Sequence, residues 1–202
     1  SSERLVIGEV VPKKQESLFF RAAGTIMRMT VKAGDTVKAG DLLAELRLDD
    51  LMDQLQQAQL DLETARDNLT ASQLQKNFDL QKAESDVTIL EDRVKLAENA
   101  LARTSGSAHE DALLNLDIIN EQLKVAQANL ELIRGKTDNY QQQLVTKNEL
   151  QVERLERLLS ERQITAPYDG IVLQSYRAVG ADVNAFDPQI LLGDSSELVI
   201  RI

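Results

Sequence analysis

The stretch LDDLMDQLQQAQLDLETARDNL, residues 48–69, decides the fold. Its small and aliphatic apolar side chains recur in alternating steps of three and four residues, which is the spacing of a coiled-coil seam. These residues are Leu48, Leu51, Leu55, Ala58, Leu62, Ala65 and Leu69. The same spacing resumes after a gap, at Leu80, Ala83, Val87, Leu90, Val94, Ala97 and Leu101. The pattern predicts one helix over residues 49–103.

A second seam follows and predicts a second helix over residues 108–162. Its members are Leu116, Ile119, Leu123, Ala126, Leu130, Ile133, Tyr140 and Leu144, followed after a shift of register by Val152, Leu155 and Leu159. No proline lies between Pro12 and Pro167, so neither helix has to break. The two segments have matched lengths, which predicts an antiparallel hairpin with a tight turn near Ser105-Gly106-Ser107.

The first seam contains one irregular step, from Leu69 to Leu80. This step is one heptad plus four residues long, and the intervening residues 70–77 are mostly polar. Such a stutter unwinds a left-handed supercoil locally. In an antiparallel hairpin this segment faces residues 133–140, where Gly135 weakens the helix. We therefore hypothesise a flexure at this level, and an ordinary stutter without motion is the alternative.

Composition excludes several classes of function. The 202 residues carry a net charge of −10, and residues 49–162 hold 22 acidic and 13 basic side chains. Nucleic-acid binding needs a basic surface, so we expect no nucleic-acid partner. The absence of cysteine excludes disulfides and thiol chemistry. No apolar run approaches the length of a membrane span. We interpret the chain as a fragment of a longer protein, anchored by a segment outside it.

Two β-rich segments flank the helices and repeat each other at one constant offset in the numbering. Gly170 corresponds to Gly24, Gly180 to Gly34, and Val183 to Val37. The Gly-Asp steps in these segments are typical of tight turns. The simplest interpretation of this internal repeat is one small β-sandwich whose halves are separated by the inserted hairpin. Insertion is tolerated where two strand ends lie close together.

Three motifs resemble those of a known family. GDTVKAGDLL, residues 34–43, resembles the signature of biotinyl/lipoyl-type domains, and APYDGIV, residues 166–172, resembles the start of their second half. LLGDSSELV, residues 191–199, is similar to the exit toward a β-barrel in periplasmic adaptors, the membrane fusion proteins of the HlyD and macrolide-efflux type. The resemblance implies an α+β fold, a coiled-coil hairpin inserted into a split lipoyl-like β-sandwich, with partial β-barrel strands at both termini.

The resemblance also implies a division of the chain into five segments. They are N-terminal strands of a truncated β-barrel at 1–22, the first lipoyl-like half at 23–48, the hairpin at 49–163 with its turn near 104–108, the second lipoyl-like half at 164–195, and the start of a barrel at 196–202. We reject a carrier role, because the tip between the halves, residues 48–51, has no lysine for lipoyl or biotin. No cofactor is expected.

By resemblance, the expected function is that of a non-enzymatic adaptor in an efflux or secretion pump. Such adaptors link an inner-membrane transporter, of the ABC or RND type, to an outer-membrane channel or a cell-wall exit. They assemble into rings, commonly of six copies, in the periplasm or on the outer face of the cytoplasmic membrane. A structural coiled-coil spacer of the envelope is the alternative. An enzyme ranks third, because no residue constellation supports acid–base, nucleophilic or metal chemistry.

Two segments are candidate partner-binding sites. The hairpin tip comprises Ala102, Arg103, Thr104, Ser105, Gly106, Ser107 and His109. The candidate channel-lining loop comprises Tyr176, Arg177, Val179 and Asp182. We expect His109, the only histidine, to be a solvated tip residue, and we expect no metal site.

Both sites depart from the family pattern. Counting from Arg93, the Leu and Ser of the family's channel-docking set become Ala97 and Thr104. Counting from Arg103, the Leu position becomes Ser107. Val179 replaces the channel-lining Gln of macrolide-type adaptors.

Overall fold

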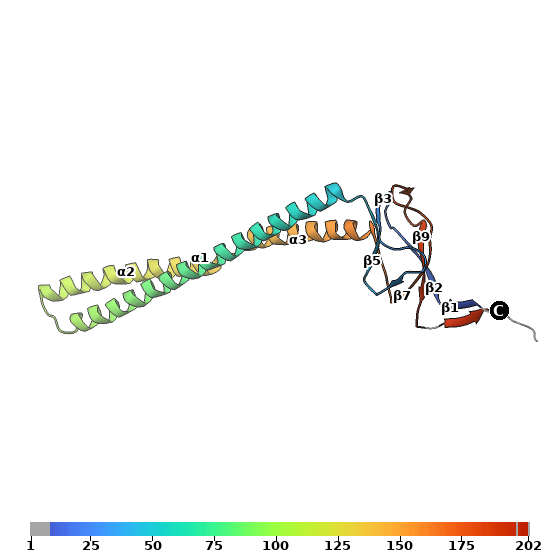
Figure 1. Ribbon diagram of the computed structural model, residues 1–202. Coiled ribbons are helices and arrows are strands. Elements are labelled where there is room, and N and C mark those ends of the chain that lie inside the picture. Colours follow the sequence, from blue (N-terminus) through green and yellow to red (C-terminus); the bar gives the residue numbers. More distant parts are fainter. Residues whose placement is uncertain (1–8, 197, 202) are drawn as a thin grey trace, which may run out of the picture. The chain divides into compact units, whose positions relative to one another are not determined.

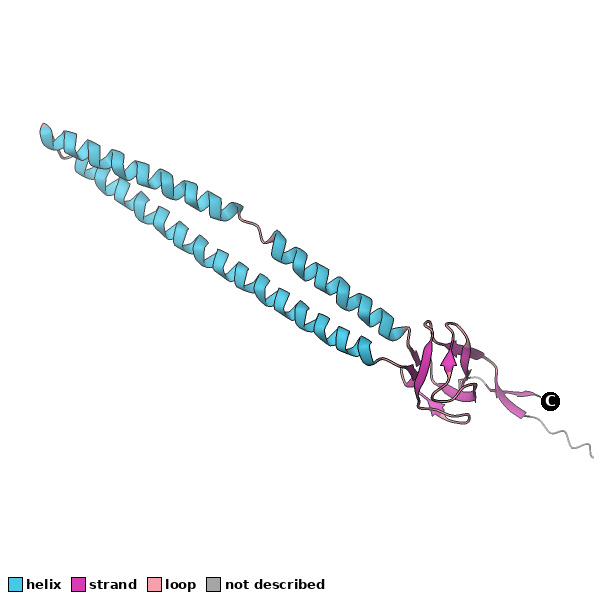
Figure 2. Cartoon of the chain, turned by 90° about the horizontal axis from the view of Figure 1, so that it is seen from above, coloured by secondary structure: helices cyan, strands magenta, loops and turns pink. Residues whose placement is uncertain are grey.

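The computed structural model describes residues 9–196 and 198–201. They form two compact units, of which the first combines the described residues up to Gln59 with those from Leu150 onward, and the second is Leu60–Glu149. The chain has three helices, α1 (Asp49–Leu101), α2 (Ser107–Gly135) and α3 (Asn139–Ser160), within the described residues (Figures 1 and 2). α2 belongs to the second unit, α1 and α3 contribute to both, and the strands belong to the first. The fold class predicted from the sequence, a helical hairpin between two groups of strands, is confirmed.

In the second unit, α1 runs antiparallel to α2 and to the start of α3, and the predicted seam is largely buried. Ala83 and Val87 of α1 pack with Leu130 and Ile133 of α2. All four side chains are less than a tenth exposed. The ion pair from Arg134 to Glu84, at 3.2 Å, lies beside the seam. The alternating spacing of three and four residues therefore identified the packing surface correctly in this part of the hairpin.

The second helical arm is interrupted, whereas an unbroken helix over residues 108–162 was predicted. This prediction was wrong, because α2 ends at Gly135 and α3 begins at Asn139. Figure 2 shows the interruption as a loop opposite the continuous α1. Lys136 has extended backbone angles, φ −63° and ψ 135°, and its N–H donates to the carbonyl of Ile133. Glycine at the last helical position lowers the cost of ending the helix there.

The polar segment of α1 supplies hydrogen bonds to the interruption. Ser72 Oγ donates to Asp138 Oδ1 at 2.6 Å, and Lys76 Nζ donates to the carbonyl oxygen of Lys136. Asp138 directly precedes α3, and its carbonyl accepts the N–H of Gln142 in the first turn of that helix at 2.9 Å. The irregular step in the first seam thus coincides with a break in the opposite arm. The motion that we hypothesised there stays a prediction.

The interruption also resets the helical phase. Tyr140 was predicted to lie in the seam, but its side chain is 69% exposed, and Val145 is buried instead. Because α3 starts as a new helix, the spacing counted continuously from Ile133 no longer applies. The prediction for Tyr140 was therefore wrong, and Leu144 is half-buried.

The strands of the first unit form two four-stranded sheets around one core. One sheet has the order β2-β9-β7-β4 and the other the order β6-β5-β3-β8. Their bounds are β2 Gln15–Phe19, β3 Gly24–Met29, β4 Thr36–Val37, β5 Leu42–Leu46, β6 Gln163–Thr165, β7 Gly170–Ser175, β8 Asp182–Val183 and β9 Pro188–Asp194. The largest side chains of the core are fully buried, among them Phe20, Ile26, Leu43, Leu46, Ile190 and Leu192.

The two halves of the sandwich exchange equivalent hydrogen bonds. Gly34 N donates to the carbonyl of Val172 at 2.7 Å, and Gly180 N donates to the carbonyl of Ile26 at 2.8 Å. Each bond is the counterpart of the other in the internal repeat. The strands pair between the halves in the same way. β4 of the first half pairs with β7 of the second, and β8 of the second half pairs with β3 of the first. Neither half can complete its sheet alone, so the chain segments before and after the hairpin have to fold together.

The two N-terminal strands, β1 (Glu9–Pro12) and β2, belong to different sheets, whereas one β-barrel was expected to contain both. Residues 1–22 were expected to belong to a separate β-barrel, but β2 pairs with β9 and Leu18 lies in the sandwich core. An alternating pattern cannot tell which sheet a short edge strand joins. β1 instead pairs with β10 (Leu198–Arg201) in a separate two-stranded sheet. Residues 1–8 of the expected N-terminal strands lie outside the described residues.

The parts of the helices that belong to the first unit pack against each other. Leu51, Leu55 and Ala58 of α1 form a buried cluster with Leu155 of α3. Leu46 N donates to the carbonyl of Arg162 at 2.9 Å, so the chain leaves and re-enters the sandwich on neighbouring strands. These strands, β5 and β6, are antiparallel partners. The hairpin is therefore a continuation of a β-hairpin, as the insertion hypothesis requires.

Candidate partner-binding sites

The hairpin tip is a short ordered loop, residues 102–106, between α1 and α2. Thr104 Oγ1 donates to the carbonyl of Leu101 at 2.9 Å and closes the end of α1. Gly106 precedes α2 with a φ of 62°, a conformation that favours glycine, and its carbonyl accepts the N–H of His109. The tip is therefore built largely by its own backbone.

The predicted tip residues come together at this loop. Thr104 is half-buried, and the other members of the set are exposed. No side chain in the described part of the chain caps the start of α2. Within the same residues, the side chains of Arg103 and His109 form no ion pair. The tip thus presents one cation, small hydroxyl side chains and an imidazole, a surface suited to polar contacts with a protein partner.

The candidate channel-lining loop connects β7 to β8 and is held at several points. Tyr176 N donates to the carbonyl of Gln189 at 2.8 Å, and Gly180 N to that of Ile26. Val179, next to Gly180, has a side chain that is 58% exposed. Arg177 and Tyr176 are also exposed. A well-anchored backbone with an exposed valine at its turn can hold an apolar side chain at a fixed position.

Asp182 has a different role from the rest of this set. Its Oδ1 accepts a hydrogen bond of 2.5 Å from Thr25 Oγ1, and the two residues are paired in β8 and β3. The carboxylate therefore ties the two halves of the sandwich together. Its exposed position still leaves its second oxygen available to a partner.

An exposed aromatic pair was missed by the sequence reasoning. Phe19 and Phe186 pack edge to face, with ring centroids 5.6 Å apart. Phe186 is 62% exposed and has a φ of 68°, which is unusual for a bulky residue. The signal was available in the sequence, because Phe186 occupies the position equivalent to Gly40 in the internal repeat.

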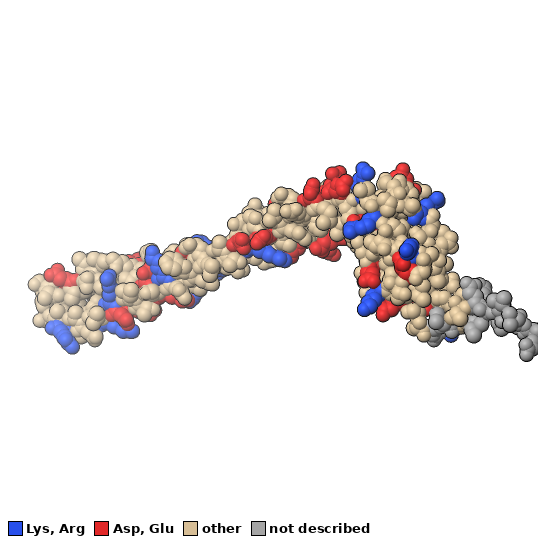
Figure 3. Space-filling view, viewed as in Figure 1, with Lys and Arg blue, Asp and Glu red and all other residues tan. Residues whose placement is uncertain are grey.

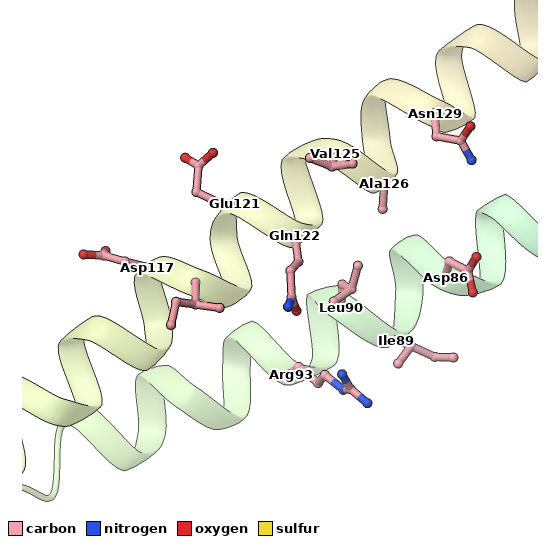
Figure 4. Close-up of a pocket in the computed structure, with 11 residues that line it drawn as sticks. Asp86, Ile89, Leu90, Arg93, Asp117, Glu121, Gln122, Val125, Ala126 and Asn129 are labelled. Atoms are coloured by element: carbon pink, nitrogen blue, oxygen red, sulfur yellow. The ribbon is translucent and has the colours of Figure 1, made fainter.

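A groove on the second unit was also missed. It has a volume of about 980 Å³ and lies between α1 and α2, where both helices contribute apolar and charged side chains. Figure 4 shows Leu90, Gln122 and Ala126 between the two helices, with Asp117 and Glu121 directed away from them. The signal that could have found it is a second apolar spacing outside the seam, at Ile89, Ile118 and Val125.

Charge is mixed over the surface that Figure 3 shows. Lysine and arginine side chains are interspersed with aspartate and glutamate, and uncharged residues cover much of this face. Among residues 9–196 and 198–201, no three His, Asp or Glu side chains gather in an arrangement that could hold a metal ion. In the same part of the chain, every helix is too polar or too short to cross a bilayer.

A solved structure shares the fold of this chain. The chain aligns with MacA from Actinobacillus actinomycetemcomitans at 22% identity and a TM-score of 0.50, over 96% of this chain and 53% of that one. It also aligns with the periplasmic adaptor EmrA at 15% identity and a TM-score of 0.44, over 96% of this chain and 76% of that one. No curated protein sequence matches.

The membrane fusion protein Spr0693 from Streptococcus pneumoniae R6 aligns at 15% identity and a TM-score of 0.39, over 96% of this chain and 64% of that one. The sequence itself matches the family described as RND MFP, barrel-sandwich hybrid domain, over residues 20–194. That range includes both halves of the sandwich and the whole hairpin. The chain therefore belongs to the RND membrane fusion protein family and carries its barrel-sandwich hybrid domain.

Proposed function

We propose that this chain is the hairpin-bearing part of a non-enzymatic adaptor, which links a transporter of the inner membrane to an exit across the outer envelope. Membership in the membrane fusion protein family supports this function. The transporter is of the ABC or RND type, and the protein lies in the periplasm or on the outer face of the cytoplasmic membrane. Several copies, six in our proposal, form a ring around the transported substrate.

The observation that carries the proposal is the way in which the hairpin is inserted. α1 leaves β5 and α3 returns to β6, and these two strands are hydrogen-bonded neighbours. A sandwich that needs both halves holds the two helix ends together. This arrangement lets the chain carry a long hairpin without breaking the sandwich, which is what a linking subunit requires.

The two candidate sites receive separate roles in this proposal. The tip set, from Ala102 to His109, contacts the exit component, which is an outer-membrane channel or the cell wall. The loop with Tyr176, Arg177, Val179 and Asp182 lines the axis of the ring. An apolar Val179 side chain from each copy would narrow the passage without hydrogen-bonding to what passes.

Photocrosslinking from the tip tests the proposal. The chain contains no cysteine, so Ser107→Cys gives one attachment point on an exposed residue. We expect the probe to capture an envelope protein or wall component in intact cells, and the transporter to co-purify with the protein. Asn99→Cys, exposed on α1 about two turns before the tip, is the matched control and should capture less. Capture of no envelope component from Ser107, with no transporter co-purified, would favour a passive spacer.

A further inference from the structure

The sandwich has an edge strand on each of its two sheets, β2 on one and β6 on the other. Each strand stands at the end of its sheet order. Within the described residues, β2 pairs only with β9, and β6 pairs only with β5. The outer side of an edge strand presents backbone N–H and C=O groups that its single neighbour cannot reach. Both strands therefore offer backbone groups to a further strand.

A cleft lies between these two strands, and we name it the edge cleft. It has a volume of about 390 Å³ and is lined by residues of β2, of β6 and of the end of α3. Arg21 N donates to the carbonyl of Glu161 at 2.9 Å, which joins the chain after β2 to the chain before β6. In the described part of the chain, no backbone hydrogen bond joins β2 itself to β6. An extended peptide chain that enters such a cleft can bond to an edge strand on either side.

The two walls of the edge cleft are equivalent in the internal repeat. Ile164 of β6 corresponds to Leu18 of β2, and both side chains are buried in the core. The next residues along the chain are exposed and differ in size, because Thr165 corresponds to Phe19. The repeat therefore supplies two similar strand edges, and only one of them ends in an aromatic side chain.

The aromatic pair of Phe19 and Phe186 lies at the edge cleft. Phe19 lines the cleft, and its ring contacts the ring of Phe186. In the other half of the repeat the equivalent residues are Thr165 and Gly40. Both members of the pair are thus aromatic in one half and small in the other. The sandwich can be built without either ring, so the pair serves a purpose that the fold itself does not require.

The backbone strain of Phe186 also points to a bound partner. Its φ of 68° is unfavourable for a bulky side chain, and its ring remains 62% exposed. Phe186 N donates to the carbonyl of Phe20, directly after β2, so the backbone fixes the ring beside the cleft. Burial in the core does not offset the strain, because most of the ring faces solvent. Strained residues of this kind are concentrated at ligand clamps.

Charged side chains define the polar part of the partner. Arg21 and Arg157 line the edge cleft, and within the described residues neither forms an ion pair. Arg21 follows Phe19 by two residues, so a cation lies close to the aromatic surface. The carboxylate of Glu16 comes from the opposite end of β2. A guanidinium group binds a carboxylate through two hydrogen bonds, which favours an acidic partner residue near Phe19.

We propose that the edge cleft binds an extended segment of a partner protein as an added β-strand between β2 and β6. An aliphatic side chain of that segment lies on the aromatic pair, and an acidic side chain lies beside Arg21 and Arg157. β6 has three residues, so about 10 Å of extended chain is held between the two walls. Backbone hydrogen bonds supply affinity, and the two side-chain contacts supply selectivity. The site belongs to the sandwich alone and does not rest on the adaptor function.

Peptides selected from a random twelve-residue library on this chain are the probe. We expect the selected peptides to share an aliphatic residue close to an acidic one. Their affinity, measured by fluorescence anisotropy, should fall roughly tenfold in Phe19→Ala and in Phe186→Gly. Phe78→Ala is the matched control, because it removes an exposed ring from the second unit. A library that yields no binder, or binders that Phe186→Gly leaves unaffected, would overturn the proposal.

Methylation of the peptide nitrogens tests binding on two sides. Successive N–H groups of a strand point to opposite sides, so a strand between two neighbours uses each of them in turn. Methylation at any of three consecutive positions should therefore lower the affinity about fivefold. A strand added to β2 alone would lose affinity only at every second position, and that pattern would contradict insertion between β2 and β6.

The arginines are tested with a matched charge control. Arg21→Gln and Arg157→Gln should each weaken the acidic peptides about tenfold at low salt. Arg154→Gln removes an exposed arginine of α3 that does not line the edge cleft and should have no effect. Equal affinity in all three variants would refute the acidic partner residue.

The fold of the variants is checked by thermal unfolding. Phe186→Gly relieves the backbone strain, so its loss of binding should occur without a loss of stability comparable to that of Phe186→Ala. Loss of binding only in variants that are also unfolded would overturn the site. None of these measurements involves the hairpin tip, so their outcome is independent of the Ser107 experiment.

Discussion

Phe186 adopts the backbone conformation that Gly40 adopts at the equivalent position of the internal repeat. The φ angles are 68° and 90°, and the amide of each residue donates a bond of 2.8 Å, from Gly40 to Ala166 and from Phe186 to Phe20. The two acceptors are themselves equivalent in the repeat. The fold therefore requires a left-handed residue at this turn in both halves, and in the second half a phenylalanine occupies it under strain.

Replacement of Phe186 should separate this strain from its contact with Phe19. Phe186→Ala loses the ring contact and keeps a side chain in the left-handed region. Phe186→Gly loses the same contact and relieves the strain, so we expect it to be more stable than Phe186→Ala by about 1 kcal/mol in denaturant unfolding. Gly40→Ala, in open space at the equivalent turn, should lose a similar amount. Equal stability of the alanine and glycine variants at 186 would refute the strain.

Gly170 is required for a different reason, the close approach of two strands. A Cβ atom at this position would lie 2.4 Å from the carbonyl oxygen of Gly193 in β9. Gly170→Ala should therefore destabilise the sandwich by roughly 1–3 kcal/mol, the usual cost of overpacking. Gly135→Ala is the control, because a Cβ atom there meets nothing within 4 Å and helix propensity should rise. Thermal unfolding that ranks Gly170→Ala at or above wild type would contradict the geometry.

The interruption between α2 and α3 should depend on the polar segment of α1. Ser72→Ala removes the bond to Asp138, and Lys76→Met removes the bond to the carbonyl of Lys136. Each bond contributes about 1 kcal/mol, so hydrogen exchange over residues 133–142 should accelerate by roughly fivefold in either variant. Thr70→Ala, whose hydroxyl bonds to the carbonyl of Arg66 within α1, is the matched control. Unchanged exchange in both variants would mean that the break is held by other contacts.

Stability should fall in acid partly through Glu45. Burial raises the pKa of this carboxyl, but hydrogen bonds from Arg28 and Gln163 outweigh it and hold the pKa below its ordinary value of 4.5. The two bonds, of 2.8 Å each, join β5 to β3 and to β6. A depressed pKa gives stability that is present above the ordinary value and is lost as the pH falls through the lower, folded value.

Glu45→Gln should therefore lower stability at pH 7 and lose less of it between pH 6 and pH 3 than the unmodified chain. Unfolding by urea across that range measures the difference. Glu63→Gln, an exposed carboxylate in the second unit, should leave the pH profile unchanged. Parallel profiles for Glu45→Gln and the unmodified chain would show that Glu45 contributes nothing to the acid sensitivity.

The sequence predicted the fold well where the spacing of apolar residues indicates directly which side chains are buried. The seam residues Leu62, Ala65, Ala83 and Val87 are buried as expected, because each alternating step of three and four residues stays in phase along an unbroken helix. The prediction failed at Tyr140, after the interruption. No proline marks that break, and it receives bonds from Ser72 and Lys76, which lie far away in the sequence.

The candidate sites were predictable to a smaller extent. The tip follows from the matched lengths of the two helical segments, and the β7–β8 loop follows from the internal repeat. The groove lined by Ile89 and Val125 was overlooked, because exposed apolar residues outside a seam resemble ordinary surface variation until both helices are placed side by side. The pairing of β2 with β9 joins strands near the two ends of the chain, which no local pattern can report.

The most direct test of the adaptor function is native mass spectrometry of the intact protein extracted from its membrane. The function predicts one complex that holds several copies of this protein together with an inner-membrane transporter. A protein that is extracted as a monomer or a simple dimer, with no transporter bound, would contradict the account.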